Sequence, residues 1–159
     1  MEKTSNSDIS TNQFIIVRIG NEQYGINIKI VDNIVRMQQI TRVPKAQKYF
    51  VGVINLRGEI VPVMSLRRRF GIEEDEFTNA TRIIIVKPEQ QATVGFIVDS
   101  VKEVVTLEED QIERNSISTD AEGQSYINAV GKNKDELISI LNILSLIHIS
   151  EPTRPLYIS

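Results

Sequence analysis

Hydrophobic residues fall mostly in short runs rich in Ile and Val, which are separated by clusters of turn-forming residues. This pattern is typical of β-strands, because strands are short and favour β-branched side chains. It predicts four hairpins, in which residues 14–19 pair with 23–28, 50–56 with 59–64, 82–87 with 93–98, and 127–130 with 137–141. We therefore expect an all-β protein built from antiparallel strands.

Helix is predicted in only two places. Residues 66–70 have the pattern of a short helix, with Ser65 as the N-cap and Gly71 at the C-terminal end. Thr106 and Glu109 have the spacing of a capping box, which predicts a helical turn before Ile112.

An internal repeat emerges when the chain is aligned with itself so that Gly25 falls on Gly95, because residues 31–35 then fall on the similar residues 101–105. Chance is one explanation, because any two hairpins rich in Val and Ile resemble each other. The interpretation that we favour is two similar β subdomains, each too small to be stable alone and therefore packed on the other. Gly25 and Gly95 lie in mid-strand, where we expect bulges or corners of small barrels.

The composition argues against most catalytic and metal chemistry. Of 159 residues, 41% are hydrophobic and 25% are charged, as in an ordinary globular domain. The chain has no Cys and a single His, His148, so thiol catalysis, disulfides and His- or Cys-rich metal sites are not expected. It also lacks a glycine-rich phosphate-binding loop. We expect a protein that is not an enzyme and has no cofactor or metal.

The charged residues indicate a solvated surface. Acidic runs at 73–76 and 108–110 are interpreted as solvated loops rather than catalytic pairs. The basic run at 67–69 is interpreted as a solvated helix face, with a phosphate contact as the alternative. Eighteen basic and 21 acidic residues give a net charge of −3, which argues against a surface dedicated to nucleic acid or anionic lipid.

Neither a signal peptide nor a membrane span is predicted. Residues 1–12 are polar and lack the apolar core of a signal peptide. No stretch reaches the roughly 18 uninterrupted apolar residues of a transmembrane helix. We expect a cytoplasmic protein.

The predicted hairpin over residues 50–64 carries Arg57 at its tip, beside Gly58. Glycine supplies a turn conformation that a residue with a Cβ resists. An Arg on a rigid hairpin is well placed for recognition, because its planar fork makes bidentate contacts. The alternative is that Arg57 covers one end of a barrel or pairs with an internal acid, and the residues alone favour neither.

Residues 52–63, followed by 66–71, resemble the central signature of the CheW-type chemotaxis coupling proteins. Residues 24–28, 40–44, 81–86, 94–99 and 137–141 follow in that family's order and spacing. The resemblance implies two intertwined SH3-like five-stranded antiparallel β-barrels around a shared apolar core, with short helices. It places a CheW-like domain of interleaved subdomains over residues 12–147, after a flexible segment at 1–11 and before a tail at 148–159 that does not fit the family.

The resemblance also implies a function. It predicts a non-enzymatic cytoplasmic adaptor that couples transmembrane chemoreceptors to a CheA-type histidine kinase. The expected partners are the kinase regulatory domain and the helical hairpin tip of a receptor, so the adaptor meets the inner face of the membrane only through receptor arrays. The alternative is a nucleic-acid-binding small β-barrel, but no nucleic acid is expected as a partner. Such a barrel needs aromatic platforms in a basic groove, whereas this chain has no Trp and an acidic balance.

Six positions correspond to the family's groove and partner-binding residues: Val31, Asn33, Gly52, Asn55, Arg57 and Gly58. By this resemblance, Val31 supplies apolar contact with a receptor helix and Gly52 permits close approach of backbone. Arg57 anchors a polar contact or holds the shape of the groove, while Asn55 and Gly58 shape the hairpin.

Asn33 is the main departure from the family among these positions. Glu is common there, so a charged contact is replaced by a neutral amide, which bears on the choice of partner. Glu103, the counterpart of Asn33 in the internal repeat, keeps the acid.

Overall fold

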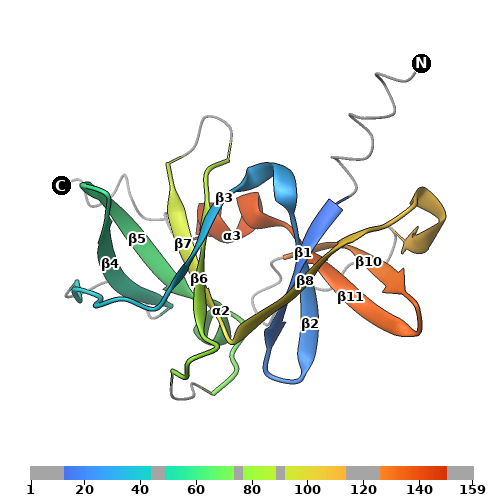
Figure 1. Cartoon of the computed structure of the whole chain (residues 1–159), viewed down its shortest axis with the longest axis horizontal. Helices are drawn as coiled ribbons and strands as arrows, with labels where there is room; N and C mark the ends of the chain where they lie inside the picture. Colours follow the sequence, from blue (N-terminus) through green and yellow to red (C-terminus); the bar gives the residue numbers. More distant parts are fainter. Residues whose placement is uncertain (1–12, 44–48, 74–76, 89–91, 114–125, 150–159) are drawn as a thin grey trace.

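A computed structural model describes residues 13–43, 49–73, 77–88, 92–113 and 126–149 (Figure 1). Strands dominate these residues and form two sheets. The first sheet has the order β8-β1-β2-β11-β10-β9, and the second has the order β3-β6-β7-β5-β4. The strands are β1 (Gln13–Ile19), β2 (Glu22–Asn27), β3 (Val31–Arg36), β4 (Phe50–Leu56), β5 (Glu59–Ser65), β6 (Arg82–Val86), β7 (Val94–Val98), β8 (Ser100–Thr106), β9 (Ile112–Glu113), β10 (Ile127–Asn133) and β11 (Glu136–Leu141).

The all-β fold and all four hairpins predicted from the sequence are confirmed. They are the antiparallel pairs β1–β2, β4–β5, β6–β7 and β10–β11. In Figure 1 the β4–β5 hairpin lies at one end of the molecule and the β10–β11 hairpin at the other. The predicted short helix is α2 (Leu66–Arg69), and the Ser65 hydroxyl caps it by accepting a hydrogen bond from the backbone N–H of Arg68 at 3.1 Å.

The two halves of the chain exchange strands. The third strand of the first half, β3, pairs with β6 in the second sheet, and the equivalent strand of the second half, β8, pairs with β1 in the first sheet. A second correspondence relates β4–β5 to β10–β11, because each hairpin joins the other strands through one parallel pair. In these pairs Val63 lies opposite Gly95 and Ile140 lies opposite Gly25, so Val63 and Ile140 occupy equivalent positions. The structure is therefore two similar, interleaved β units.

The first sheet has a sixth strand where five were expected. That strand, β9, follows β8 along the chain after the 3-10 turn η2 (Glu109–Gln111), and it pairs with β10 at the opposite edge. The second sheet has a similar link, since Thr41, beyond β3, exchanges backbone hydrogen bonds of 2.8 and 2.9 Å with Val53 of β4. The two sheets are thus linked in the same way: the chain that follows β8 bonds to β10, and the chain that follows β3 bonds to β4.

Two local predictions are corrected in part. Gly25 and Gly95 are not bulges, because their pairings keep register and the shifts occur at other positions. Close packing of neighbouring side chains leaves little room for a side chain at either position. A Cβ at Gly25 would lie 3.2 Å from the Ile138 side chain, and a Cβ at Gly95 would lie 2.8 Å from the Ile83 side chain. The helical turn predicted before Ile112 is present as η2, but Thr106 does not cap it, because Thr106 ends β8 and the capping box of η2 joins Glu108 and Gln111.

A helix that the sequence did not predict, α3 (Ile143–Ile149), closes the described chain. Ile143, Leu146 and Ile147 are buried in the largest core cluster, which contains residues of both sheets. The backbone of α3 runs past the expected domain end at 147. The segments at 1–11 and 150–159 lie outside the described residues.

Candidate partner-binding site

The tip of the β4–β5 hairpin is a tight turn formed by Arg57 and Gly58. Both residues have a positive φ, of 53° and 85° respectively, as in the two-residue turns that match the twist of antiparallel strands. The side-chain oxygen of Asn55 accepts a hydrogen bond of 2.9 Å from the backbone N–H of Gly58. Asn55 and Gly58 therefore hold the conformation in which the hairpin presents Arg57.

The surface at this tip combines a cation with apolar area. Arg57 is exposed, and within the described parts of the chain its guanidinium makes no hydrogen bond or ion pair. The interpretation that it pairs with an internal acid thus finds no support there. Ile60, three residues on, is 61% exposed, although it lies in a strand that is otherwise largely buried. Exposed apolar area beside an unpaired Arg is typical of protein-binding surfaces.

Ile60 was not predicted from the sequence, because it lies in an unbroken apolar run from Ile60 to Val63. Such a run does not reveal which of its residues faces outward. The one available signal was strand alternation, which places Ile60 on the opposite face from buried Val61.

Gly52 supplies a close backbone approach, and the approaching backbone is that of the same chain. A Cβ at Gly52 would lie 2.2 Å from the carbonyl oxygen of Thr41. Gly52 also lies at the register shift between β4 and β5. The absence of a side chain at Gly52 therefore lets Thr41 of the same chain approach β4 and bond to it.

Val31 and Asn33 lie on β3, at the opposite edge of the second sheet from β4. Val31 is half-buried and packs against the main core cluster. The side-chain oxygen of Asn33 accepts a hydrogen bond of 2.8 Å from the backbone N–H of Ile34. The structure thus gathers Gly52, Asn55, Arg57 and Gly58 on one hairpin and places Val31 and Asn33 on another strand of the same sheet.

Three acidic or phenolic groups have shifted pKa values for reasons that are local and structural. Burial, followed by the neighbouring Tyr126 and Glu22, raises the pKa of Tyr24 to about 12. Burial acts to raise the pKa of Asp99, but hydrogen bonds from Arg67 and Gly20 and the charge of Arg67 more than offset it and lower that pKa.

Glu136 is the third group, and hydrogen bonds first from Gln23 and then from Lys102 lower its pKa. Its carboxylate lies 3.2 Å from the Lys102 ammonium. Each shift thus has a local cause, which is mainly burial at Tyr24 and hydrogen bonds and charges of identified neighbours at Asp99 and Glu136.

The basic run is not the solvated helix face that the sequence suggested. Arg69 is buried, and its guanidinium lies 5.4 Å from the centre of the Tyr49 ring. The side chain of Arg67 is 19% exposed and forms an ion pair with Asp99. The physical reason is that α2 packs on the rest of the molecule, which the local pattern of three Arg residues does not reveal.

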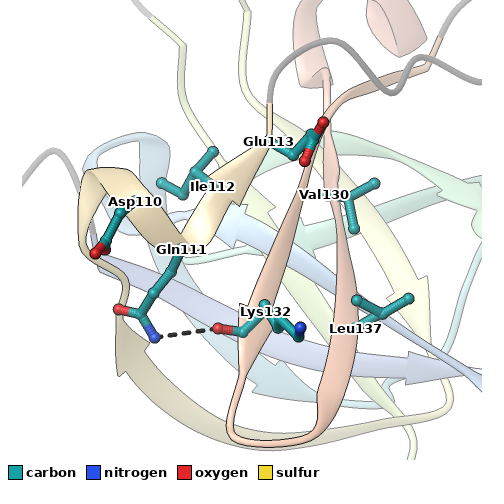
Figure 2. A pocket seen from close by; sticks show the side chains of 7 residues that line it. All are labelled: Asp110, Gln111, Ile112, Glu113, Val130, Lys132 and Leu137. Atoms are coloured by element: carbon teal, nitrogen blue, oxygen red, sulfur yellow. Dashed lines mark hydrogen bonds between the residues drawn. The ribbon is translucent and has the colours of Figure 1, made fainter.

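A cavity of about 430 Å³ lies beside the β10–β11 hairpin (Figure 2). Its polar lining includes a hydrogen bond of 3.1 Å from the Gln111 side-chain amide to the Lys132 carbonyl oxygen. The side chains that line it are mixed in character: Asp110, Gln111, Ile112, Glu113, Val130, Lys132 and Leu137. Among the described residues, no group of three or more His, Cys, Asp or Glu side chains could hold a metal ion.

None of the helices in the described segments has the length and apolar character needed to cross a membrane.

Comparison with known families gives a match that spans all of the described residues. The sequence model of the CheW-like domain matches residues 13–151. These bounds include every strand of the described residues, together with α2 and α3.

Several characterised relatives are similar over most of their length. The chain is 35% identical to the chemotaxis protein CheW of Bacillus subtilis over 137 residues, which cover 86% of this chain and 87% of the relative. It is 33% identical to the chemotaxis protein CheW of Klebsiella aerogenes, covering 87% and 83% of the two chains. The crystal structure of the scaffolding protein CheW from Thermoanaerobacter tengcongensis has a TM-score of 0.75, with 33% identity over 83% of this chain and 89% of that chain.

Proposed function

The chain belongs to the CheW-like domain family, and on that premise we propose that it is a chemotaxis adaptor that couples chemoreceptors to a CheA-type histidine kinase. The observation that carries this proposal is the similarity to CheW proteins over most of both chains, in sequence and in fold. The nucleic-acid alternative finds no support in these comparisons.

The proposed mechanism uses binding alone. A scaffold without catalytic groups changes the activity of a kinase only by binding one of its conformational states more tightly than another. We assign one surface to each partner: the β4–β5 hairpin to the regulatory domain of the kinase, and the region of β3 to the helical hairpin tip of a receptor. The adaptor then meets the inner face of the membrane only through receptor arrays.

The exposed residues suit these assignments. On the hairpin, Arg57 offers a bidentate donor and Ile60 offers apolar contact, and the Asn55–Gly58 hydrogen bond holds the turn that carries them. On β3, Val31 offers part of an apolar surface, next to Ile34, which is exposed. Asn33, a neutral amide where Glu is common in the family, then selects among receptors.

A three-component sedimentation experiment tests this function. The chain is mixed with a CheA-type kinase and a receptor cytoplasmic fragment, first with each alone and then with both. We expect the chain to bind each partner and to increase the amount of kinase that sediments with receptor assemblies. No binding to either partner, or salt-sensitive binding to single-stranded nucleic acid instead, would overturn the proposal.

A further inference from the structure

The segment that follows the partner-binding hairpin is attached to the first sheet by a set of polar contacts. In α2, directly after β5, the Arg67 guanidinium donates from Nε to one oxygen of Asp99 at 2.8 Å and from Nη2 to the other at 2.7 Å. Its remaining nitrogen, Nη1, donates to the carbonyl oxygen of Glu73 at 2.6 Å. This bidentate geometry fixes both the distance and the angle between the two side chains.

Asp99 lies where the chain passes from one sheet to the other. It is the single residue between β7 of the second sheet and β8 of the first sheet. Its Oδ2 also accepts a hydrogen bond of 2.9 Å from the backbone N–H of Gly20, in the turn between β1 and β2. Its own N–H donates to the carbonyl oxygen of Arg18 at 3.0 Å. One carboxylate therefore joins α2, the crossover and the first sheet.

Aromatic contacts reinforce the same attachment. Phe70, the C-cap of α2, lies 5.1 Å from the ring centre of Tyr24 and stacks at 4.6 Å on Tyr126. Tyr24 lies in β2 of the first sheet, and Tyr126 lies directly before β10 of the same sheet. The residues from Arg67 to Phe70 thus form a joint between the partner-binding hairpin and the first sheet.

The equivalent place at the other end of the molecule is built differently. Because Val63 corresponds to Ile140, α2 corresponds to the start of α3. The two helices have similar N-caps: Ser65 accepts a hydrogen bond from the N–H of Arg68, and Asn142 accepts one from the N–H of Ser145.

The residues of the ion pair have no counterparts at that end. The same correspondence matches Arg67 with Leu144, and the alignment of Gly25 with Gly95 matches Asp99 with Lys29. The helix α3 is attached through the buried side chains of the core cluster. The ion pair therefore exists at only one of the two equivalent ends.

We propose that Arg67 and Asp99 are positioning residues, which fix the orientation of the β4–β5 hairpin relative to the first sheet. This inference rests on the proposed function for its biological consequence: a partner bound at the hairpin is held at a defined angle to the rest of the scaffold. Loss of the pair lets the hairpin and α2 adopt several orientations, while the shared core keeps the chain folded. Binding of one partner then no longer affects the bound orientation of the other partner. Coupling between two binding sites needs a structural element whose conformation both sites influence.

The first test measures orientation without any partner. Since the natural sequence has no Cys, Glu59→Cys and Asp135→Cys place two spin labels at the exposed turns of the two hairpins. We expect one narrow distance distribution in this background, and a broader or shifted one after Arg67→Gln or Asp99→Asn. The matched control is Lys102→Gln, which breaks an exposed ion pair with Glu136 outside the joint and should leave the distribution unchanged. An unchanged distribution in both joint variants would overturn the inference.

The second test separates the inference from the proposed function. Affinities for the kinase regulatory domain and the receptor fragment are measured singly, and kinase activity is measured in the assembled complex. We expect Arg67→Gln to keep each single affinity within about twofold and to reduce receptor control of the kinase about tenfold. If the unmodified protein binds neither partner, the proposed function fails. If it binds both and Arg67→Gln behaves like Lys102→Gln, only the inference fails.

Discussion

Arg57 combines a left-handed backbone conformation with an exposed guanidinium at the tip of the β4–β5 hairpin. We predict that Arg57→Ala weakens binding of the kinase regulatory domain by about 2 kcal/mol, or roughly thirtyfold, because interface Arg residues are among the most frequent binding hot spots. Isothermal titration calorimetry with the isolated regulatory domain measures this change.

The chain offers a matched control for that substitution. Lys134 has φ 62° in the turn between β10 and β11, which is equivalent to the turn at Arg57. Lys134→Ala removes a cation from the same backbone conformation and should leave kinase binding unchanged. Equal losses in the two variants, or unchanged binding by folded Arg57→Ala, would refute the assigned role of Arg57.

Tyr24 makes the stability of the protein depend on alkaline pH. Its pKa is raised to about 12 in the folded state, whereas an exposed tyrosine titrates near 10. Between these values the unfolded chain loses the phenolic proton and the folded chain keeps it, so the free energy of unfolding falls as pH rises from 10 to 12. We predict a fall of at most about 3 kcal/mol from this group, and Tyr24→Phe should remove it. Urea denaturation at pH 9 and 11 compares the two proteins, and parallel decreases in both would contradict the assignment.

At the scale of single elements, local turn chemistry was readable from the sequence and long-range neighbours were not. Arg57 and Gly58 were predicted as a hairpin tip because their conformations depend on residues within a few positions, whereas the role of Asn55 was implied by the resemblance to the family. The contact of Gly52 with Thr41 was not predictable, because it arises when the chain beyond β3 reaches β4. The same reason explains Arg67, whose partner Asp99 is 32 residues away.

Helix α3 shows a different kind of failure. Its signal was present, since Asn142 is a good N-cap residue and Ile143, Leu146 and Ile147 have the spacing of one helix face. The departure from the family pattern after Ile143 led us to expect no fold element there. The buried positions of Leu146 and Ile147 correct that expectation.

Truncation separates the part of the C-terminal region that stabilises the core from the part outside the expected domain. We predict that deletion of residues 148–159 leaves the free energy of unfolding nearly unchanged, because α3 loses only its last two residues and keeps the buried side chains of Ile143, Leu146 and Ile147. Deletion of residues 146–159 also removes the buried side chains of Leu146 and Ile147, and should cost at least about 4 kcal/mol. Thermal and urea denaturation of the two truncated chains measure the difference. Similar destabilisation by both deletions would show that residues 148–159 contribute to the fold.

At the scale of the whole molecule, the internal repeat predicted two similar units, but the repeat alone did not reveal how they are connected. Strand exchange leaves the hydrophobic pattern of β3 and β8 unchanged, so only the resemblance to a known family implied that the units are intertwined. The pairing partners settle the question: β3 bonds to β6, and β8 bonds to β1. Similar local sequences thus produce one interdependent structure.

This exchange predicts that neither half of the chain folds alone. Among the described strands, residues 1–75 retain only the pairs β1–β2 and β4–β5, with the Thr41–Val53 bridge, because β1, β2, β3 and β5 each lose a partner strand that lies in the other half. Isolated two-stranded hairpins are at best marginally stable in water. We therefore expect the fragments 1–75 and 76–159 to lack a cooperative urea transition singly and to regain one when mixed at equal concentration. The intact chain, nicked by a protease at a site introduced between residues 75 and 76, is the control for loss of the covalent connection. A cooperative transition in either fragment by itself would mean that the unit is autonomous and that strand exchange is not required for its stability.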